Sequence, residues 1–449
     1  MARRIFLHVG TPKTGTTYLQ GVLWANKEAL QQQGLLLPLR HVRDHFYLTN
    51  IARQWSPKIE VMPAAGRKSW ERMVEEVRSW TEDVLISHEL FASVSTERAK
   101  WALDELAALG DEVHVIVTAR DLARMAPAEW QQSVKHGRSH GLAEHYELLK
   151  AEDPERLDSE ELLLLDQDPE VANSEHMPIL FWKVQNLPAL LHRWGQWLPP
   201  ERVHLVTVPP SGAPRDLLWN RFASTVGIDP ATVDQSVTIP NDSLGVVEVE
   251  TLRRINGLLP PGLTGTRKQV LVRQVLGDGI LTARPDARRF GVPAEHHSWV
   301  VERGARMVDQ LRRLPYDVVG NLDDLLPAAE PVSGPMPEDV PDSEIAKVAV
   351  ETIAAFIGEV GERENGLRAS NDNLRGRLEQ RTARVARLEK QLPQAQQQLQ
   401  QARQQLQQAR QQLQQARGMF RDERALPLKT HLRRRAGLAK RKLLRRPLP

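Results

Sequence analysis

Eight residues near the amino terminus form a segment that can bind an anion through its backbone. The apolar run Ile5–Val9 leads directly into Gly10-Thr11-Pro12-Lys13-Thr14-Gly15-Thr16-Thr17, after which apolar residues recur with helical spacing. A strand, a glycine-containing loop and a helix start bring several backbone N–H groups and the positive end of a helix dipole to one point. The segment therefore predicts a site for a phosphate or sulfate group.

The position of the lysine separates this loop from that of the nucleotide triphosphatases. There, glycine, four residues and glycine are followed by Lys, which contacts the β- and γ-phosphates, and by Ser or Thr, which binds Mg²⁺. Gly10 and Gly15 have this spacing, but Thr16 occupies the lysine position and the lysine is Lys13, inside the loop. The site keeps a cation beside the anion but lacks the arrangement that holds a metal-bound triphosphate.

Two other expected strands end in residues suited to chemistry. Arg120 follows the run Val113–Ala119, and His88 and Glu89 follow the run Asp83–Ser87. Arginine offers a planar fork to phosphate oxygens, whereas His and Glu can accept a proton. Because side chains alternate at a strand end, His88 and Glu89 are not expected to face the same point. We favour Glu89 as the residue that accepts a proton in a reaction at this edge, and we keep His88 as the alternative.

The loop resembles the 5′-phosphosulfate loop of the bacterial sulfotransferase family, whose typical sequence is Pro-Lys-[Ser/Thr]-Gly-[Ser/Thr]-[Ser/Thr]. These enzymes use 3′-phosphoadenosine 5′-phosphosulfate (PAPS), and they resemble this chain in placing an Arg at a strand end and a Ser on the next helix. The resemblance implies that the donor contacts Pro12, Lys13, Thr14, Gly15, Thr16, Thr17, Arg120 and Ser133. Ser133 stands thirteen positions after Arg120, whereas about eight is usual, so Gln131 could take its place.

The resemblance also implies in-line transfer of a sulfonyl group to a hydroxyl or amine, with Lys13 stabilising the leaving phosphate and no metal. Ser87-His88-Glu89 resembles two branches of the family, one that uses His and a carbohydrate-modifying branch that uses Glu. The expected acceptor is accordingly a carbohydrate or glycolipid, and Trp55, Trp70 or Trp299 could stack on a sugar. Two other hypotheses remain open: a P-loop kinase, which needs ATP and Mg²⁺, and a non-catalytic scaffold in which a degenerate nucleotide-binding domain serves a coiled coil.

Residues 1–328 are predicted to form an α/β domain, a P-loop-like parallel sheet flanked by helices. Nearly unbroken runs of Val, Ile and Leu are typical of strands that are buried on both faces. The predicted strands are Ile5–Val9, Asp83–Ser87, Val113–Ala119 and Val203–Val208. Apolar periodicity and helix-ending residues predict helices over Thr16–Gln33, Glu97–Leu109, Leu122–His136 and Trp182–Trp197.

The remaining chain reads as three segments. Residues 329–345 are rich in proline and indicate a linker, 346–417 carry a heptad pattern that predicts a C-terminal coiled coil, and 418–449 form a basic tail. Pro393 is expected to kink or interrupt the heptads. The pattern predicts self-association as a parallel dimer or trimer, against the alternative of a single charged or disordered segment.

Composition limits the remaining possibilities. The 449 residues include no cysteine, which excludes disulfides and thiolate chemistry, and the formal net charge is +3. Neither an export signal nor an apolar run of membrane-spanning length is visible, so we expect a cytoplasmic protein. The tail could bind an anionic membrane surface, which would place the protein peripherally at the inner membrane, or an acidic polysaccharide; we expect no nucleic-acid partner.

Overall fold

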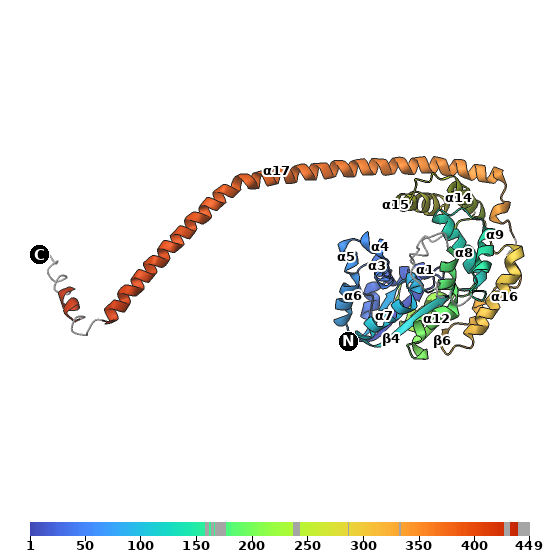
Figure 1. Ribbon diagram of the computed structural model, residues 1–449, viewed down its shortest axis with the longest axis horizontal. Helices are drawn as coiled ribbons and strands as arrows, with labels where there is room; N and C mark the ends of the chain where they lie inside the picture. Colours follow the sequence, from blue (N-terminus) through green and yellow to red (C-terminus); the bar gives the residue numbers. More distant parts are fainter. Residues whose placement is uncertain are drawn as a thin grey trace. The chain divides into compact units, whose positions relative to one another are not determined.

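The computed structural model describes residues 1–157, 161–162, 166, 177–236, 243–285, 287–331, 334–425 and 432–438. The chain divides into a compact unit, Met1–Glu359, and a second unit, Val360–Pro449. The first unit contains a sheet with helices on both faces (Figure 1). The α/β class that the sequence predicts is confirmed.

All neighbouring strands of the sheet are parallel, in the order β2-β3-β1-β4-β5-β6. The strands are β1 (Ala2–Gly10), β2 (Leu35–Leu36), β3 (Asp83–Ser87), β4 (Gly110–Ala119), β5 (Val203–Thr207) and β6 (Asp317–Val319). The four predicted strands are all present, and β2 and β6 are short additions at the two edges. Strand β1 lies between β3 and β4, so the segments that follow these three strands meet at one edge of the sheet.

Helices connect and cover the strands. They are α1 (Thr16–Ala25), α2 (Lys27–Gln32), α3 (Val42–Ala52), α4 (Ser56–Glu60), α5 (Ala64–Arg67), α6 (Ser69–Arg78), α7 (Thr96–Ala107), α8 (Leu122–Lys135), α9 (Leu142–Ala151), α11 (Met177–Gln185), α12 (Leu187–Gly195), α13 (Leu217–Val226), α14 (Val246–Leu258), α15 (Gly265–Lys268) and α16 (Ala294–Leu311). A π-helix, η4 (Gln269–Leu281), follows α15, and the 3₁₀ helices are η1 (Glu89–Ser93), η2 (Pro200–Arg202), η3 (Pro230–Thr232), η5 (Leu322–Leu325) and η6 (Pro337–Asp339).

Two of the predicted helices are each divided into two. The break after α1 falls at Asn26, whose side chain donates to the carbonyls of Val22 and Asp234 and accepts from the N–H of Asp234. The break before α12 falls at Asn186, one residue before the helix begins and two before Pro188, which has no N–H to continue α11. A side chain bound to a distant segment and a proline thus end helices that apolar spacing alone would continue.

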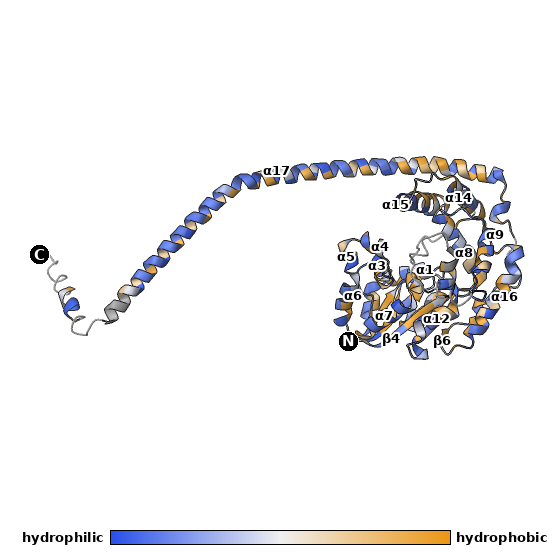
Figure 2. Ribbon diagram, viewed as in Figure 1, coloured by the Kyte–Doolittle hydropathy of each residue, from blue (hydrophilic) through white to orange (hydrophobic). Residues whose placement is uncertain are grey.

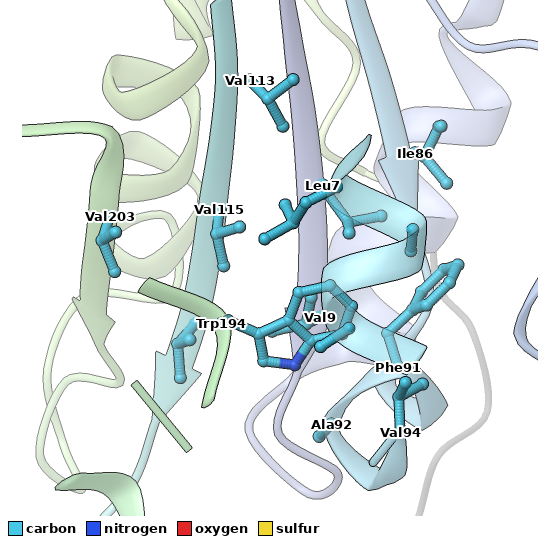
Figure 3. Packing of buried hydrophobic residues seen from close by; sticks show 14 of the residues in the cluster. Leu7, Val9, Ile86, Phe91, Ala92, Val94, Val113, Val115, Trp194 and Val203 are labelled. Carbon is cyan, nitrogen blue, oxygen red and sulfur yellow. The ribbon is translucent and has the colours of Figure 1, made fainter. Parts of the chain in front are cut away.

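Alternate residues of the central strands build two cores. Leu7 and Val9 of β1 and Val115 of β4 face Trp194 of α12 and Phe91 of η1 (Figure 3). On the other face, a separate cluster joins strands β1, β3, β4 and β5 to helices α1 and α13; it includes Phe6, Leu85, Ile116, Val206, Leu19 and Trp219. Burial on both faces explains why the strand sequences are almost continuously apolar.

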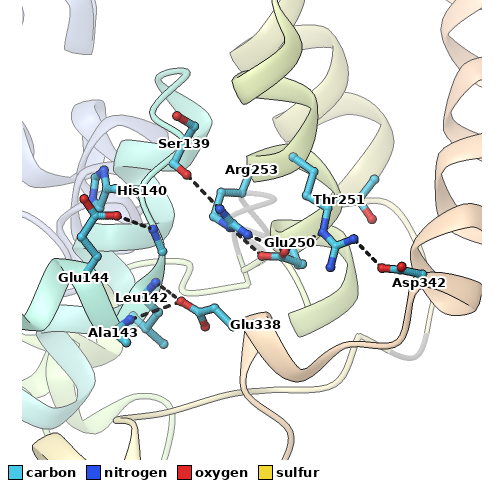
Figure 4. A network of polar contacts seen from close by, with 12 residues as sticks. Ser139, His140, Leu142, Ala143, Glu144, Glu250, Thr251, Arg253, Glu338 and Asp342 are labelled. Carbon is cyan, nitrogen blue, oxygen red and sulfur yellow. Dashed lines mark hydrogen bonds and ion pairs between the residues drawn. The ribbon is translucent and has the colours of Figure 1, made fainter.

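A third core lies away from the sheet and includes the proline-rich segment. Val340, Ile345 and Val348 are buried against α8, α9 and α14. Glu338 accepts hydrogen bonds from the N–H groups of Leu142 and Ala143 at the start of α9 (Figure 4). Proline limits hydrogen bonding but does not prevent packing, so the segment predicted as a linker packs within the compact unit from Met336 onward.

The same network fixes the start of α17 (Asp342–Ala425) within the first unit. Glu250 is fully buried and accepts from Arg253 and Arg254, each at 2.7–2.8 Å, and Arg254 also donates to Asp342 at 2.6 Å (Figure 4). The compact unit consequently ends at Glu359, beyond the residue 328 predicted for the catalytic domain.

Helix α17 is continuous through Pro393 and changes direction partway along its length (Figure 1). Apolar residues recur along it at intervals between hydrophilic ones (Figure 2). In the second unit these side chains are exposed, as for Leu367, Leu374 and Leu399 at 71%, 58% and 54%. Of the predicted basic tail, 418–449, the structure describes 418–425, which form the end of α17, and 432–438; the remaining tail residues lie outside the described ranges. Among the described helices, none is both long and apolar enough to cross a membrane.

Candidate active site

The predicted anion loop joins β1 to α1, at the edge of the sheet where β3 and β4 also end. Gly15 is the N-cap of α1 with φ of 82°, and neither a capping side chain nor an acidic residue in the first turn neutralises this helix start. Within the described chain, no carbonyl or side chain accepts from the N–H groups of Lys13, Thr14 or Gly15. Thr16 and Thr17 add the N–H groups that every helix start leaves free. The loop therefore offers a set of unused donors suited to an anion.

Gly10 allows the loop to pass directly under the end of β3. Its φ is +101°, and a Cβ atom there would lie 2.7 Å from Cα and 2.9 Å from the carbonyl oxygen of Glu89. Only glycine fits both the backbone conformation and the space. The close approach places Glu89 next to the first residue of the loop, as the sequence predicts from the meeting of strand ends.

Buried hydroxyls hold the loop against β4. The Thr14 hydroxyl lies 2.6 Å from the Thr118 hydroxyl and donates to the Thr11 carbonyl, and the Thr11 N–H donates to the Thr118 carbonyl at 2.9 Å. His8 contacts the same Thr118 hydroxyl at 3.3 Å, and burial lowers the pKa of His8 to about 4, so it is neutral. The Thr14 hydroxyl thus holds the loop in shape. Thr14 would contact a ligand through its backbone N–H.

Lys13 adopts a left-handed conformation, φ 64°, which non-glycine residues adopt rarely; Leu39 and Gln54 do so as well. Its Nζ donates to Oε1 of Gln132 on α8 at 2.6 Å. Burial lowers the pKa of Lys13, while the nearby carboxylate of Glu129 opposes that change. The ammonium is therefore poorly solvated, and it belongs to the same loop as the open N–H groups.

Arg120, at the end of β4, points to the loop. Its Nη1 donates to the Lys13 carbonyl at 3.2 Å, and its Nε is buried with no hydrogen-bond partner among the described residues. Burial and the neighbouring Arg124 lower the pKa of Arg120 to about 10, which still leaves it charged at neutral pH. The charge of Asp121 opposes this lowering of the pKa, but the Asp121 carboxylate is hydrogen-bonded to the side chain and N–H of Arg124. An arginine with an unused donor is suited to a second phosphate.

The structure does not bring Ser133 to the loop. Ser133 is fully buried, and its hydroxyl donates to the Trp130 carbonyl at 2.7 Å. Gln131 is also occupied, since its amide bonds both the N–H and the carbonyl of Leu244. Gln132 of the same helix contacts the loop through the Nζ of Lys13. The 3′-phosphate role of Ser133 stays a prediction, and the geometry offers it no free hydroxyl toward Lys13.

His88 and Glu89 follow β3 as a coupled pair, with His88 Nδ1 and Glu89 Oε2 3.9 Å apart. Burial lowers the pKa of His88. Burial alone would raise the pKa of Glu89, but His88, the backbone and the Gln20 amide, 3.0 Å away, together lower it. Near neutral pH the pair is therefore a neutral imidazole beside a carboxylate.

The tautomer of His88 follows from its backbone contact. Nδ1 accepts from the N–H of Leu90 at 3.2 Å, so the neutral ring carries its proton on Nε2. His88 has no free lone pair for an acceptor unless it gives up this bond. The side chain of Glu89 is 26% exposed, and as a carboxylate it retains lone pairs beyond the one that accepts from Gln20.

Several site residues were not predicted. Gln20 lies one helical turn beyond Thr16 and supports Glu89, a relation that spacing could have suggested. Gln132 lies on α8, and only the packing of α8 on the loop shows that it contacts Lys13. Of the tryptophans proposed to stack on a sugar, Trp70 is buried against Trp101, with ring centroids 4.6 Å apart.

Other features lie apart from this site. Within the described residues, no three His, Asp or Glu side chains gather as metal ligands would. A hollow of about 440 Å³ is lined by Arg3, Arg4, Asp111 and Glu112. It lies at the opposite, amino-terminal ends of β1 and β4.

Comparison with known proteins yields one weak structural similarity. No protein-family model matches the chain, and no sequence among curated proteins does. A crystal structure of a sulfotransferase from Alicyclobacillus acidocaldarius aligns with 61% of this chain and 97% of its own length, at 14% identity and a TM-score of 0.29. A similarity at this level adds nothing to what the site itself indicates.

Proposed function

We propose that this chain is a sulfotransferase that moves a sulfonyl group from PAPS to a hydroxyl or amine of a carbohydrate or glycolipid acceptor. One observation carries the proposal: two separate anion-binding features, the open loop with Lys13 and the unpartnered Nε of Arg120, converge at one sheet edge beside a carboxylate. A donor with phosphate at both its 5′ and 3′ positions matches two such features. A triphosphate donor would call for a lysine at Thr16.

Each residue then has a chemical role. The N–H groups of residues 13–17 would hold the 5′-phosphosulfate, and Arg120 the 3′-phosphate. Glu89 would take the acceptor proton as the acceptor oxygen or nitrogen bonds to sulfur. Lys13 would stabilise the negative charge on the phosphate oxygen when its bond to sulfur breaks, which releases adenosine 3′,5′-bisphosphate. Donor charge, acceptor proton and leaving group are all accounted for by these residues.

The base assignment predicts different effects of two matched substitutions. Glu89→Gln keeps the Gln20 contact but removes the proton acceptor, so we expect kcat to fall by about 10²–10⁴. His88→Gln should lower kcat less than tenfold, because His88 has no free lone pair. Turnover of both variants, with thermal unfolding as the folding control, checks this. A large loss in His88→Gln with full turnover in Glu89→Gln would reverse the assignment.

Arg120 provides the test of donor class. We expect Arg120→Ala to weaken binding of adenosine 3′,5′-bisphosphate by about 10–100-fold, the effect of a lost hydrogen bond to a charged group. Binding of adenosine 5′-phosphate should change little, because it lacks the 3′-phosphate. Titration of both ligands into both proteins isolates the 3′-phosphate contribution. Equal losses for the two ligands would contradict this role for Arg120.

We also propose that two or three copies of the chain associate as a parallel coiled coil through the predicted heptad segment, 346–417, chiefly through its part beyond Glu359. The seam leucines are exposed in a single chain, and a second copy offers the same apolar repeat in the same register. The full chain should sediment as a dimer or trimer, and a chain ending at Glu359 as a monomer. Monomers in both cases would end this proposal. A cut at Glu359 keeps Ile345 and Val348 in the core, which a cut at residue 328 would remove.

A further inference from the structure

A chain of buried hydrogen bonds runs from the end of β3 through β1 and β4 into the anion loop. Its members are Ser87, His8, Thr118 and Thr14, and each of these side chains is fully buried. The Ser87 hydroxyl lies 2.8 Å from Nδ1 of His8, whose Nε2 lies 3.3 Å from the Thr118 hydroxyl. That hydroxyl lies 2.6 Å from the Thr14 hydroxyl, which bonds to the Thr11 carbonyl. One polar chain thus joins three strands to the loop.

The carbonyl at the end of this chain fixes the position of every proton in it. A carbonyl oxygen only accepts, so the Thr14 hydroxyl donates to Thr11 and its oxygen has to accept from Thr118. The Thr118 proton is then used, so Nε2 of His8 has to donate to the Thr118 oxygen. His8 is neutral because burial lowers its pKa to about 4, and its unprotonated Nδ1 accepts from Ser87. The tautomer of His8 with its proton on Nε2 therefore satisfies every contact.

A second buried histidine fixes the residue at the other end of the chain. Nε2 of His45 on α3 lies 3.0 Å from the Pro38 carbonyl, so it carries the proton and donates. Its Nδ1 lies 3.2 Å from the backbone nitrogen of Ser87 and accepts from that N–H. Ser87 is thus held through both its N–H and its hydroxyl. The next two residues are His88 and Glu89, so the chain connects the strand end that bears the predicted proton acceptors with the donor loop.

The shape of the loop depends on the Thr118 member of the chain. Its carbonyl accepts the Thr11 N–H at 2.9 Å, and its hydroxyl is the donor to Thr14. Without that hydroxyl, the Nε2 proton of His8 would lose its acceptor and the Thr14 oxygen its donor. A buried polar group that loses its partner is costly, and bonds in such a chain strengthen one another. Phe222 of α13 packs edge-on against the His8 ring, with ring centroids 5.0 Å apart, and keeps it in place.

We propose that His8 and Thr118 are positioning residues for the 5′-phosphosulfate of the donor, because the proton order that they impose holds the loop with its N–H groups open. The inference rests on the proposed function, which supplies the anion. Both side chains are fully buried and act through Thr14 rather than on the ligand. Arg120 contacts the loop separately, at the Lys13 carbonyl. The 3′-phosphate should therefore bind independently of the chain.

The first test measures the tautomer of His8 in the native full chain at neutral pH. Long-range ¹H–¹⁵N NMR spectra of protein with ¹⁵N-labelled histidine distinguish the two ring nitrogens, and the signal that is missing from His8→Gln identifies His8. We expect a protonated Nε2 and an unprotonated Nδ1. A proton on Nδ1, or on both nitrogens, would overturn the proton order and the proposal with it. This measurement requires no ligand.

The second test compares two substitutions of Thr118. Valine keeps the shape of threonine without the hydroxyl, whereas serine keeps the hydroxyl. In calorimetric titration of the full chain, Thr118→Val should bind adenosine 3′,5′-bisphosphate about tenfold more weakly than the native protein, and Thr118→Ser within about threefold of it. Binding of adenosine 3′-phosphate, which has no group for the loop, should stay the same in both variants. A general structural defect would weaken both ligands alike.

Thr251→Val is the matched control for the loss of a buried hydroxyl. Thr251 lies on α14 and donates to the Val247 carbonyl at 2.7 Å, so this variant should bind both ligands as the native protein does. Thermal unfolding checks the folding of each variant, and the tautomer of His8 decides the proton order even where Thr118→Val does not fold.

The outcomes separate this inference from the proposed function. Undiminished bisphosphate binding by folded Thr118→Val, or an equal loss for the two ligands, would overturn the positioning role and leave the proposed function intact. Failure of the native protein to bind the bisphosphate would overturn the proposed function and this inference with it.

Discussion

Lys13→Met is expected to lower kcat by about 10²–10³, the usual cost of removing one preorganised group that stabilises developing charge. Methionine keeps the length of the side chain but offers no charge to the leaving phosphate. Because the Nζ of Lys13 makes a single hydrogen bond within the described part of the chain, to Gln132, folding should be preserved. Release of adenosine 3′,5′-bisphosphate, with a carbohydrate acceptor fraction on which the native chain is active, measures the change.

Lys100→Met is the matched control. Lys100 is exposed on α7 and pairs with Asp104 four residues away at 2.7 Å, so its loss should alter neither turnover nor stability appreciably. Full activity of Lys13→Met would show that the loop lysine does not act on the leaving group. Equal losses in the two variants would indicate a general effect of charge.

Gly10→Ala is expected to destabilise the fold and to abolish turnover together. The new Cβ would lie 2.7 Å from the Glu89 backbone, at a φ of +101° that alanine disfavours. Strain of this kind costs about 1–3 kcal/mol before the steric contact is added. The backbone must move at the point where the loop and the predicted base meet, so donor binding should weaken as well.

Gly212→Ala is the control that separates the backbone strain of a positive φ from the steric contact of a new Cβ atom. Gly212 has a similar φ of +90°, but a Cβ there would meet nothing within 4 Å. The free energy of unfolding of the Gly212→Ala protein, measured with denaturant, should be only about 1 kcal/mol lower than that of the native protein. Turnover should be retained. If Gly10→Ala were no more destabilised than Gly212→Ala and remained active, the close packing of the loop under Glu89 would be wrong.

The sequence predicts the parts of the fold that follow from local chemistry. Asp83–Ser87 is predicted to the residue because a strand buried on both faces has a nearly uniform apolar sequence. Strands β2 and β6 are too short, at two and three residues, to show any pattern. The division of Thr16–Gln33 depends on Asn26 contacting Asp234, and sequence spacing carries no trace of such a contact.

The same distinction applies to the site. The loop, Arg120 and the His88–Glu89 pair are predictable because each lies at a strand end, and parallel strands bring their ends together. The orientation of Ser133 and the Gln132 contact depend on the rotation of α8 about its axis, which tertiary packing sets. Pro393 is expected to kink or interrupt the heptads, and α17 is not interrupted there, because a long helix can bend around one proline.

The central claim is that the site binds a nucleotide with phosphates at both ends of its ribose and requires no metal. Calorimetric titration of the full chain in the presence of EDTA, with adenosine 3′,5′-bisphosphate and with ATP, tests it directly. We expect the bisphosphate to bind at least about tenfold more tightly than ATP, a difference of about 1.4 kcal/mol. Binding of ATP that appears only with Mg²⁺, without binding of the bisphosphate, would indicate a kinase, and binding of neither would indicate a scaffold; both results would contradict the account.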